Sequence, residues 1–322
     1  MLGRLVNERL ATAMPEYPWG DTLPLLIAGD ALFINLECVI ADRGDPWPGK
    51  TFTFRSDSRN VEVLAAARAT AASLANNHSL DYGREALRDC IASLLERGIG
   101  VAGAGPSLDA ARRPAVFSVD GFRVAFAAFT DNEPGWEAGP DIPGVFHVPL
   151  EPPNAKFDDL LSIVAGAKRE NDVVIVSAHW GPNWGYAPPA EHLEAAHRLV
   201  NAGADVVFGH SPHVVRGVEL YRNRPILYSC GDYVDDYMVD EVERNDESCI
   251  FCVDYSPDRV RRILLIPTII QEFQARQATG ERRAEILRRV RAQCAGLGTR
   301  TRETLEGLEI DCLNVQDGGD AP

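Results

Sequence analysis

Residues 73–83, SLANNHSLDYG, mark a change of pattern that organises this chain. A run of small and apolar residues, typical of a buried strand, ends here in Asn76, Asn77 and His78. From Tyr82 onward the apolar residues recur at helical spacing. Amide and imidazole groups therefore gather at the predicted end of a buried strand, just before a helix begins.

The same alternation continues on both sides of this stretch. Apolar runs typical of strands occur at 31–40, 69–76, 99–105, 172–181 and 204–213, a hairpin closed at Asp120-Gly121 is predicted at 115–129, helices are predicted at 82–97, 157–170, 191–203 and 281–296, and strands predominate over 217–270. Alternating strands and helices predict an α/β layered fold. We expect one domain over 1–270, followed by a helix and an acidic, disordered tail over 271–322.

Composition excludes several classes of function. The 322 residues carry 32 basic and 47 acidic side chains, a net charge of −15, which argues against a general nucleic-acid binder because phosphate neutralisation needs a basic face. The sequence contains no run of about 18 apolar residues, so no membrane span is predicted. The first ten residues, MLGRLVNERL, are too short and too charged for a signal peptide.

The cysteines favour a reducing compartment. Seven are scattered along the chain, an odd number. Cys249 and Cys252 form a CxxC motif, but it lies within an apolar, aromatic run without a second pair nearby, so buried free thiols are expected rather than a zinc site. Scattered free thiols favour a cytoplasmic protein.

Polar residues closely follow four of the apolar runs. They are Glu37, the pair Asn77 and His78, His179, and the pair His210 and His213. Ligands bind outside the carboxyl ends of strands in open α/β sheets, so these groups are expected to converge. A carboxylate, an amide oxygen and imidazoles suit manganese, zinc or iron. Taken singly, Glu37 could be a capping or salt-bridged residue, the asparagines could be turn formers, and His179 could be a stacked, structural histidine. His147, His192 and His197 are interpreted as ordinary residues.

Several motifs carry a resemblance to a known family. They are MLGR (1–4), FINLE (33–37), LANNHSLDYG (74–83), AHWGPNWGY (178–186), GHSPHVVRGVELY (209–221) and ILYSCGDYVDDY (226–237). In this order they resemble the CapA family of poly-γ-glutamate capsule synthesis proteins, related to calcineurin-like metallophosphoesterases. The resemblance implies a sandwich of two mixed sheets flanked by helices, with one or two divalent metal ions at the strand ends.

The resemblance also implies roles for individual residues. Glu37 would be the bridging carboxylate, Asn77 a ligand of the second metal, and His179 and His210 imidazole ligands. His213 would be a further ligand or contact the substrate, and Asp232 is a weaker candidate. His78 would protonate the leaving group. Asp81 would either orient His78 or cap the following helix.

Two departures from the family pattern stand out. Many relatives read GxHPH, with histidines two apart, whereas GHSPH at 209–213 spaces them three apart, which leaves open which histidine binds metal. Relatives also begin GDVMLGR, with a strand ending in an Asp that ligates the first metal. This chain begins at the Met of that motif. We therefore expect an upstream start, and expect strand 31–36 to carry an unpaired edge without that first strand.

These patterns predict a cytoplasmic, metal-dependent hydrolase of the CapA type. Its substrate would be a phosphoester or an amide such as a γ-glutamyl bond, in a small molecule or an anionic polymer. The alternative is a non-catalytic module with a degenerate metal site that binds an anionic polymer or a partner protein.

Overall fold

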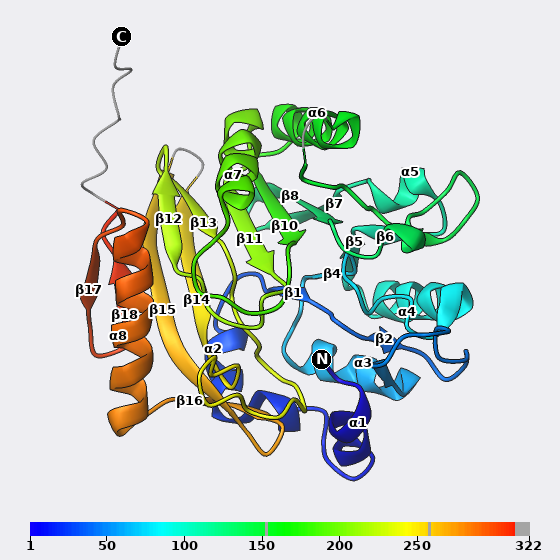
Figure 1. Ribbon diagram of the computed structural model, residues 1–322, viewed down its shortest axis with the longest axis horizontal. Coiled ribbons are helices and arrows are strands. Elements are labelled where there is room, and N and C mark those ends of the chain that lie inside the picture. The colour runs from blue at the N-terminus through cyan, green and yellow to red at the C-terminus, as the bar shows by residue number, and fades with distance from the viewer. Residues whose placement is uncertain (152–153, 257–258, 313–322) are drawn as a thin grey trace.

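The computed structural model describes residues 1–151, 154–256 and 259–312 (Figure 1). Its centre is a six-stranded sheet in the order β12-β13-β11-β10-β8-β7. The members are β7 (Ala115–Val119), β8 (Phe122–Thr130), β10 (Val173–His179), β11 (Val206–His210), β12 (Val218–Tyr221) and β13 (Arg224–Leu227). Strands β8, β10, β11 and β13 run parallel, and β7 and β12 are antiparallel edge strands.

A parallel three-stranded sheet packs against the inner face of this sheet. It contains β1 (Phe33–Asn35), β4 (Ala71–Ser73) and β5 (Gly100–Ala102), in the order β1-β4-β5. Small residues at the contact, including Ala75 and Ala128, let the sheets approach closely. A Cβ at Gly103, whose φ is +82°, would lie 2.4 Å from the Cβ of Ala75, so glycine is required there.

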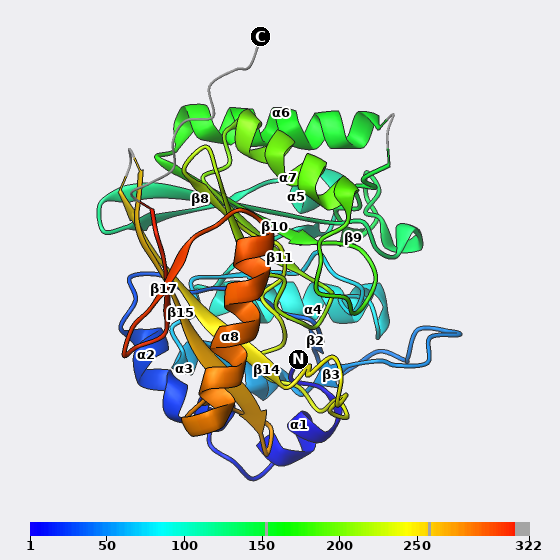
Figure 2. The same ribbon diagram turned by 60° about the vertical axis from the view of Figure 1, so that its left-hand side comes forward.

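A third, antiparallel sheet occupies the C-terminal part of the chain. It is built from β14 (Glu247–Ser256), β15 (Arg259–Gln271), β16 (Gln274–Gln277), β17 (Thr301–Glu303) and β18 (Leu308–Ile310). Helix α8 (Gly280–Gly296) covers it, as Figures 1 and 2 show. Apolar side chains of α8, among them Ile286, Leu287 and Val290, form one core with Ile263 and Leu265 of β15.

The remaining helices complete the layers. Helices α6 (Ala155–Glu170) and α7 (Ala190–Ala202) cover the outer face of the six-stranded sheet (Figure 1). Helices α1 (Arg4–Leu10), α2 (Leu23–Ile27), α3 (Val61–Ala66) and α4 (Gly83–Glu96) share a core with β1 and β4. Short elements connect these layers. Two strand pairs are formed by β2 (Val39–Ile40) with β3 (Arg55–Ser56) and by β6 (Ala104–Gly105) with β9 (Gly144–Val145). The others are helix α5 (Leu108–Ala111) and 3₁₀ turns at Tyr17–Thr22, Ser58–Asn60 and Pro134–Trp136.

The predicted fold class is confirmed: mixed sheets are flanked by helices. The predicted hairpin is formed by β7 and β8, and its turn lies at Asp120 and Gly121, whose φ angles are +45° and +82°. The predicted strand at 31–40 is instead split into β1 and β2, because residues 36–38 leave the sheet after β1. Leu95 of the predicted helix 82–97 is 57% exposed.

The C-terminal region holds more structure than the sequence predicted. Beyond the predicted helix, β17 and β18 pair with each other and β18 pairs with β15. Of the predicted disordered tail, residues 313–322 lie outside the described residues. Within the described ranges, the model contains no helix that is both long and apolar enough to cross a membrane.

Candidate functional site

Two pairs of parallel strands bring the predicted site residues together. Strands β10 and β11 end in His179 and His210, which are direct partners in the parallel register. Strands β1 and β4 are also parallel partners, and Glu37 and Asn77 follow their carboxyl ends. The parallel register sets the two strand ends of each pair side by side. The packing of one sheet on the other then brings Glu37 to His179, with 4.0 Å between Oε2 and Nδ1.

Glu37 lies beside the two histidines. Its Oε2 is 4.0 Å from Nδ1 of His179 and accepts a hydrogen bond of 2.8 Å from the side chain of Asn35. Its Oε1 is buried and has no hydrogen-bond partner among the described residues. Burial raises the pKa of Glu37, and the charge of His213 opposes this. A second, unpaired oxygen on a buried carboxylate is a free acceptor for a cation.

His179 and His210 contact each other directly. Their Nδ1 atoms are 2.7 Å apart, and Nε2 of His210 is 2.7 Å from the hydroxyl of Ser177. Burial holds the pKa of His179 well below its usual range and lowers that of His210 to about 3, so both rings are neutral near pH 7. Neutral imidazole is the form that binds metals.

Two assignments of the ring protons satisfy this chain of contacts, because either His179 or His210 can be the donor between the two Nδ1 atoms. If His179 donates from Nδ1 to His210, then His210 donates from Nε2 to Ser177. The buried Nε2 of His179, which has no partner among the described residues, then carries a bare lone pair. Both nitrogens of His210 are engaged, so a metal bond from His210 requires that it give up one of these contacts.

The two asparagines differ in what they do. Asn76 is fully buried and joins the ends of β1 and β4: its amide donates to Asn35 and to the Leu36 carbonyl, and its oxygen accepts from the His78 N–H at 3.0 Å. Asn76 is therefore structural, as one interpretation of the sequence held. The side-chain oxygen of Asn77 is buried without a partner among the described residues.

His78 belongs to a hydrogen-bonded group with Asp81 and Lys50. Its Nδ1 is 2.6 Å from Oδ2 of Asp81, which also accepts from the Phe54 N–H at 2.6 Å. Lys50 binds Oδ1 of Asp81 at 2.7 Å, donates to the Asn77 carbonyl and lies 4.2 Å from the centre of the Trp136 ring. Helix α4 has no side-chain cap. Of the two predicted roles for Asp81, the geometry supports orienting His78.

His213 is paired with Asp232 instead of with the other histidines. Its Nδ1 lies 2.9 Å from Oδ1 of Asp232, and its ring meets Tyr237 edge-to-face at 5.2 Å. Burial raises the pKa of Asp232 to about 7. The three-residue spacing of GHSPH therefore sends His210 toward His179 and His213 toward the loop at 231–237.

The other histidines have separate partners. His192 stacks on Trp180, His197 stacks on Tyr221 and contacts Glu219, and Nε2 of His147 lies 3.2 Å from the Asp131 carbonyl. Sequence reasoning missed Lys50, Asn35 and Ser177 as contributors to the site. Asn35 and Ser177 lie in strands that end next to predicted ligands, and this position could have identified them as site residues. Lys50 lies in a loop, where the sequence carries no such signal.

The donor set has the chemistry of a divalent-cation site. The unpartnered atoms Oε1 of Glu37, Oδ1 of Asn77 and Nε2 of His179 are a carboxylate, an amide and an imidazole acceptor. Within the described ranges, however, no group of three or more His, Cys, Asp or Glu side chains is arranged to hold a metal ion. The residues therefore fit a cation by type, and a closed ligand shell requires side-chain movement.

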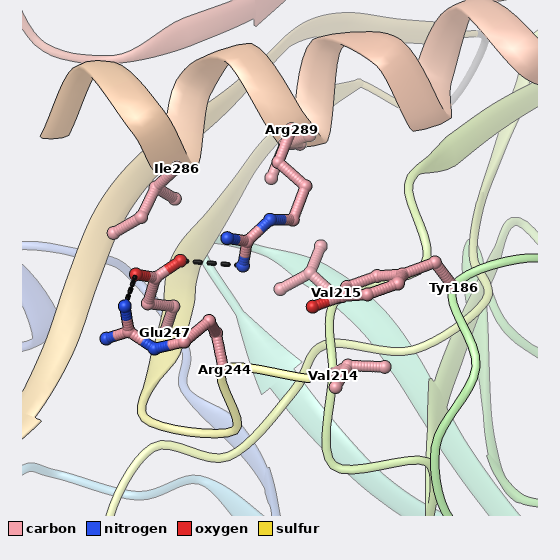
Figure 3. Close-up of a pocket in the computed structure, with 8 residues that line it drawn as sticks. Tyr186, Val214, Val215, Arg244, Glu247, Ile286 and Arg289 are labelled. Atoms are coloured by element: carbon pink, nitrogen blue, oxygen red, sulfur yellow. Dashed lines mark hydrogen bonds and ion pairs between the residues drawn. The ribbon is translucent and has the colours of Figure 1, made fainter. Parts of the chain in front are cut away.

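The loop that follows β10 is tied to the C-terminal layer. Tyr186 of this loop donates to the Glu243 carbonyl. Next to it, Glu247 at the start of β14 accepts from Arg289 of α8 at 2.7 Å and lies 3.1 Å from Arg244 (Figure 3). Arg282 of α8 binds the same carboxylate at 2.8 Å. The C-terminal layer thus contacts this loop through the Glu243 carbonyl and through Arg289, whose guanidinium lies 5.6 Å from the centre of the Tyr186 ring.

The fold and site define a mixed α/β protein in which parallel strand ends gather a carboxylate, amides and histidines. The model of the bacterial capsule synthesis protein family PGA_cap matches residues 1–237, and the chain belongs to this family. The resemblance to CapA proteins predicted from the sequence is thereby confirmed. All the predicted ligands and both predicted catalytic residues lie within the matched range.

Curated relatives carry related descriptions. A probable polyglutamine synthesis accessory protein of Mycobacterium tuberculosis is 42% identical over 244 residues, covering 73% of this chain and 64% of the relative. The PGA biosynthesis protein CapA of Bacillus subtilis is 29% identical over 239 residues, covering 73% of this chain and 61% of the relative. The chain thus matches under two thirds of the length of these relatives.

A solved structure, of a hypothetical protein from Thermus thermophilus, is similar at 15% identity and a TM-score of 0.43. The likeness covers 80% of this chain and 89% of that one.

Proposed function

We propose that this chain is a metal-dependent hydrolase of the CapA type. It would cleave a phosphoester or an amide, such as a γ-glutamyl bond, in the metabolism of poly-γ-glutamate or a related polymer. The observation that carries this proposal is the set of unpartnered buried acceptors, Glu37 Oε1, Asn77 Oδ1 and His179 Nε2, beside the hydrogen-bonded group of His78, Asp81 and Lys50.

Manganese, zinc or iron is the expected ion, because mixed carboxylate, amide and imidazole donors suit borderline metals. Glu37, Asn77 and His179 would hold it, joined by His210 and His213 if they leave their present partners. A bound ion would lower the pKa of a water molecule and stabilise the negative charge that develops during hydrolysis.

His78 and its partners would handle the proton of the leaving group. Asp81 holds Nδ1 of His78, which leaves Nε2 for exchange with substrate. Burial lowers the pKa of His78 and Asp81 opposes this. A bound anionic substrate would favour the protonated ring, because opposite charges nearby stabilise each other. As a water oxygen forms a bond to the phosphoryl or acyl centre and the ester or amide bond breaks, the water would release a proton to solvent and His78 would give its own proton to the leaving atom.

A second candidate is a non-catalytic module that binds an anionic polymer or a partner protein. The observation that favours it is the lack of a closed three-ligand group within the described ranges. Metal analysis of the purified protein, with a screen of generic phosphoester and γ-glutamyl substrates, separates the two. Bound metal with turnover supports the hydrolase, and neither supports the binding module.

The compartment is part of the proposal. We propose a cytoplasmic location, supported by the free cysteines of the described residues, four of which are buried. Fractionation of cells that produce the protein tests this: recovery outside the cytoplasm would contradict it.

A further inference from the structure

The loop between β2 and β3 is fixed against the turn that follows β4. A Cβ at Gly44, whose φ is +100°, would collide with the Tyr82 carbonyl, so glycine is required at this close approach. The Trp47 N–H donates to the Asp81 carbonyl at 2.7 Å, and the Lys50 N–H donates to the Trp47 carbonyl at 3.2 Å. The loop therefore brings the side chain of Lys50 to the carboxylate of Asp81.

Lys50 contacts two groups that follow β4. Its Nζ donates to Oδ1 of Asp81 at 2.7 Å and to the Asn77 carbonyl. The Asp81 side chain is fully buried, and its Oδ2 contacts Nδ1 of His78. A buried carboxylate needs an opposite charge, and among the described residues Lys50 is the only Lys or Arg side chain paired with Asp81. Lys50 thus fixes both the carboxylate that orients His78 and the main chain beside it.

Lys50 also contacts the loop that follows β8, a strand of the other sheet. Its Nζ lies 4.2 Å from the centre of the Trp136 ring and 3.8 Å from Oε1 of Glu133. Glu133 has a φ of +52°, a left-handed conformation that is uncommon for a residue with a side chain. Strand β4 belongs to the three-stranded sheet and β8 to the six-stranded sheet. Lys50 therefore links strand-end loops of the two sheets whose packing forms the candidate site.

We propose that Lys50 is a positioning residue of the candidate site. It holds Asp81, and through Asp81 the ring of His78, at a fixed place relative to the unpartnered acceptors of Asn77 and His179. It acts through Asp81, without contact to the substrate. The proposal rests on the proposed hydrolase function, in which His78 gives a proton to the leaving atom while those acceptors hold the cation. A misplacement of about 1 Å between such groups can slow a reaction about 10²-fold, because reacting groups must be held close to their productive geometry.

The test removes the ammonium group and then supplies it from solution. In Lys50→Ala, kcat should fall about 10–100-fold while KM changes less than about threefold, because the residue touches Asp81 and not the substrate. Butylammonium chloride should restore much of the lost kcat in this variant, and potassium chloride at the same concentration should not. Unchanged turnover would overturn the proposal. A raised KM with unchanged kcat would also overturn it, since Lys50 would then be a substrate-binding residue.

Lys168 of α6 provides a matched control. Its Nζ donates to Oδ2 of the buried Asp205 at 2.7 Å and to the Asp172 carbonyl at 2.6 Å, so it holds one carboxylate and one carbonyl, as Lys50 does. These acceptors lie at the amino ends of β11 and β10, opposite the candidate site. Lys168→Ala should therefore keep its kcat, whatever it does to stability. Equal losses of kcat in the two variants would show general destabilisation and would overturn the proposal.

A second measurement does not need turnover. The Phe54 N–H donates to Oδ2 of Asp81 at 2.6 Å, so its hydrogen exchange reports how firmly this carboxylate is held. Relative to the amides of β10, exchange at Phe54 should be about tenfold or more faster in Lys50→Ala but not in Lys168→Ala, and butylammonium should slow it again. If the parent chain turns over no substrate while this pattern appears, the hydrolase function fails and the placement of Asp81 by Lys50 stands. Unchanged exchange in Lys50→Ala would overturn the proposal.

Discussion

His179 and His210 face each other across neighbouring parallel strands with their Nδ1 atoms 2.7 Å apart. Because Ser177 contacts the far nitrogen of His210, the chain of hydrogen bonds fixes the orientation of His179. Its free Nε2 then becomes the ring atom available to a ligand. In the proposed metal site, His210 would be either a second ligand or the residue that orients His179, and substitution can distinguish these roles.

If the proposed metal site is correct, His179→Ala should lower metal occupancy by about tenfold or more, because the substitution would remove an imidazole ligand. His210→Ala should also lower occupancy, and by about as much if it is a ligand itself; the loss of an orienting partner typically costs 10–100-fold in affinity. Metal content and titration with Mn²⁺ or Zn²⁺ measure both. His197→Ala is the control, since His197 contacts Glu219 and Tyr221. Unchanged occupancy in the His179 variant would remove this residue from the metal site.

His78→Ala should keep its metal and lose turnover by about 10²–10⁴-fold, the range typical of general acid catalysis. Asp81→Asn should also slow turnover, because Asp81 contacts Nδ1 of His78 and Lys50. The measurements are metal content and activity on whichever generic substrate responds. Loss of metal in the His78 variant would make it a ligand, and unchanged turnover would make it structural.

Acid should destabilise the folded chain through buried histidines. Burial lowers the pKa of His192 from 6.5 to about 4, so below pH 6.5 the unfolded state takes up a proton that the folded state refuses. The contribution of neutral His192 to the free energy of unfolding is fully present above pH 6.5 and is lost progressively as the pH falls toward 4. The loss from this residue amounts to roughly 3 kcal/mol at most.

His192→Phe isolates that contribution. The variant can keep the stacking on Trp180, and no hydrogen bond is lost at Nδ1, which has no partner among the described residues. Urea unfolding at pH 7 and pH 5 should show a smaller drop in stability for the variant than for the parent chain. An equal drop in both proteins would show that His192 does not carry this pH dependence.

Glu247→Ala should destabilise the chain by about 3–5 kcal/mol, because it leaves the cluster of Arg244, Arg282 and Arg289 without its central, buried carboxylate. Glu303→Ala is the matched control: this carboxylate also contacts two arginines, but its side chain is 46% exposed, so the expected loss is at most about 1 kcal/mol. Denaturant unfolding measures both. Similar losses in the two variants would contradict the role assigned to burial.

The sequence by itself determined the local elements and the positions of the polar groups along the chain. Apolar runs and helical spacing predicted the core strands and the four longest of the described helices, α4, α6, α7 and α8, because hydrophobic periodicity and turn residues such as Gly121 act over a few residues. The short motifs sufficed for the family resemblance. Their positions after strands predicted that Glu37, His179 and His210 lie together; the parallel register accounts for His179 beside His210, whereas the packing of two sheets brings Glu37 to them.

Only the tertiary structure decided how these groups are partnered. Lys50 reaches Asp81 from a distant loop, Asp232 pairs with His213, and Asn76 joins β1 to β4 while Asn77 keeps a free oxygen. Strands β17 and β18 had no local signal either. Each depends on contacts between segments far apart in sequence, where strand register and packing, not local preference, determine which polar atoms are satisfied and which remain free to bind.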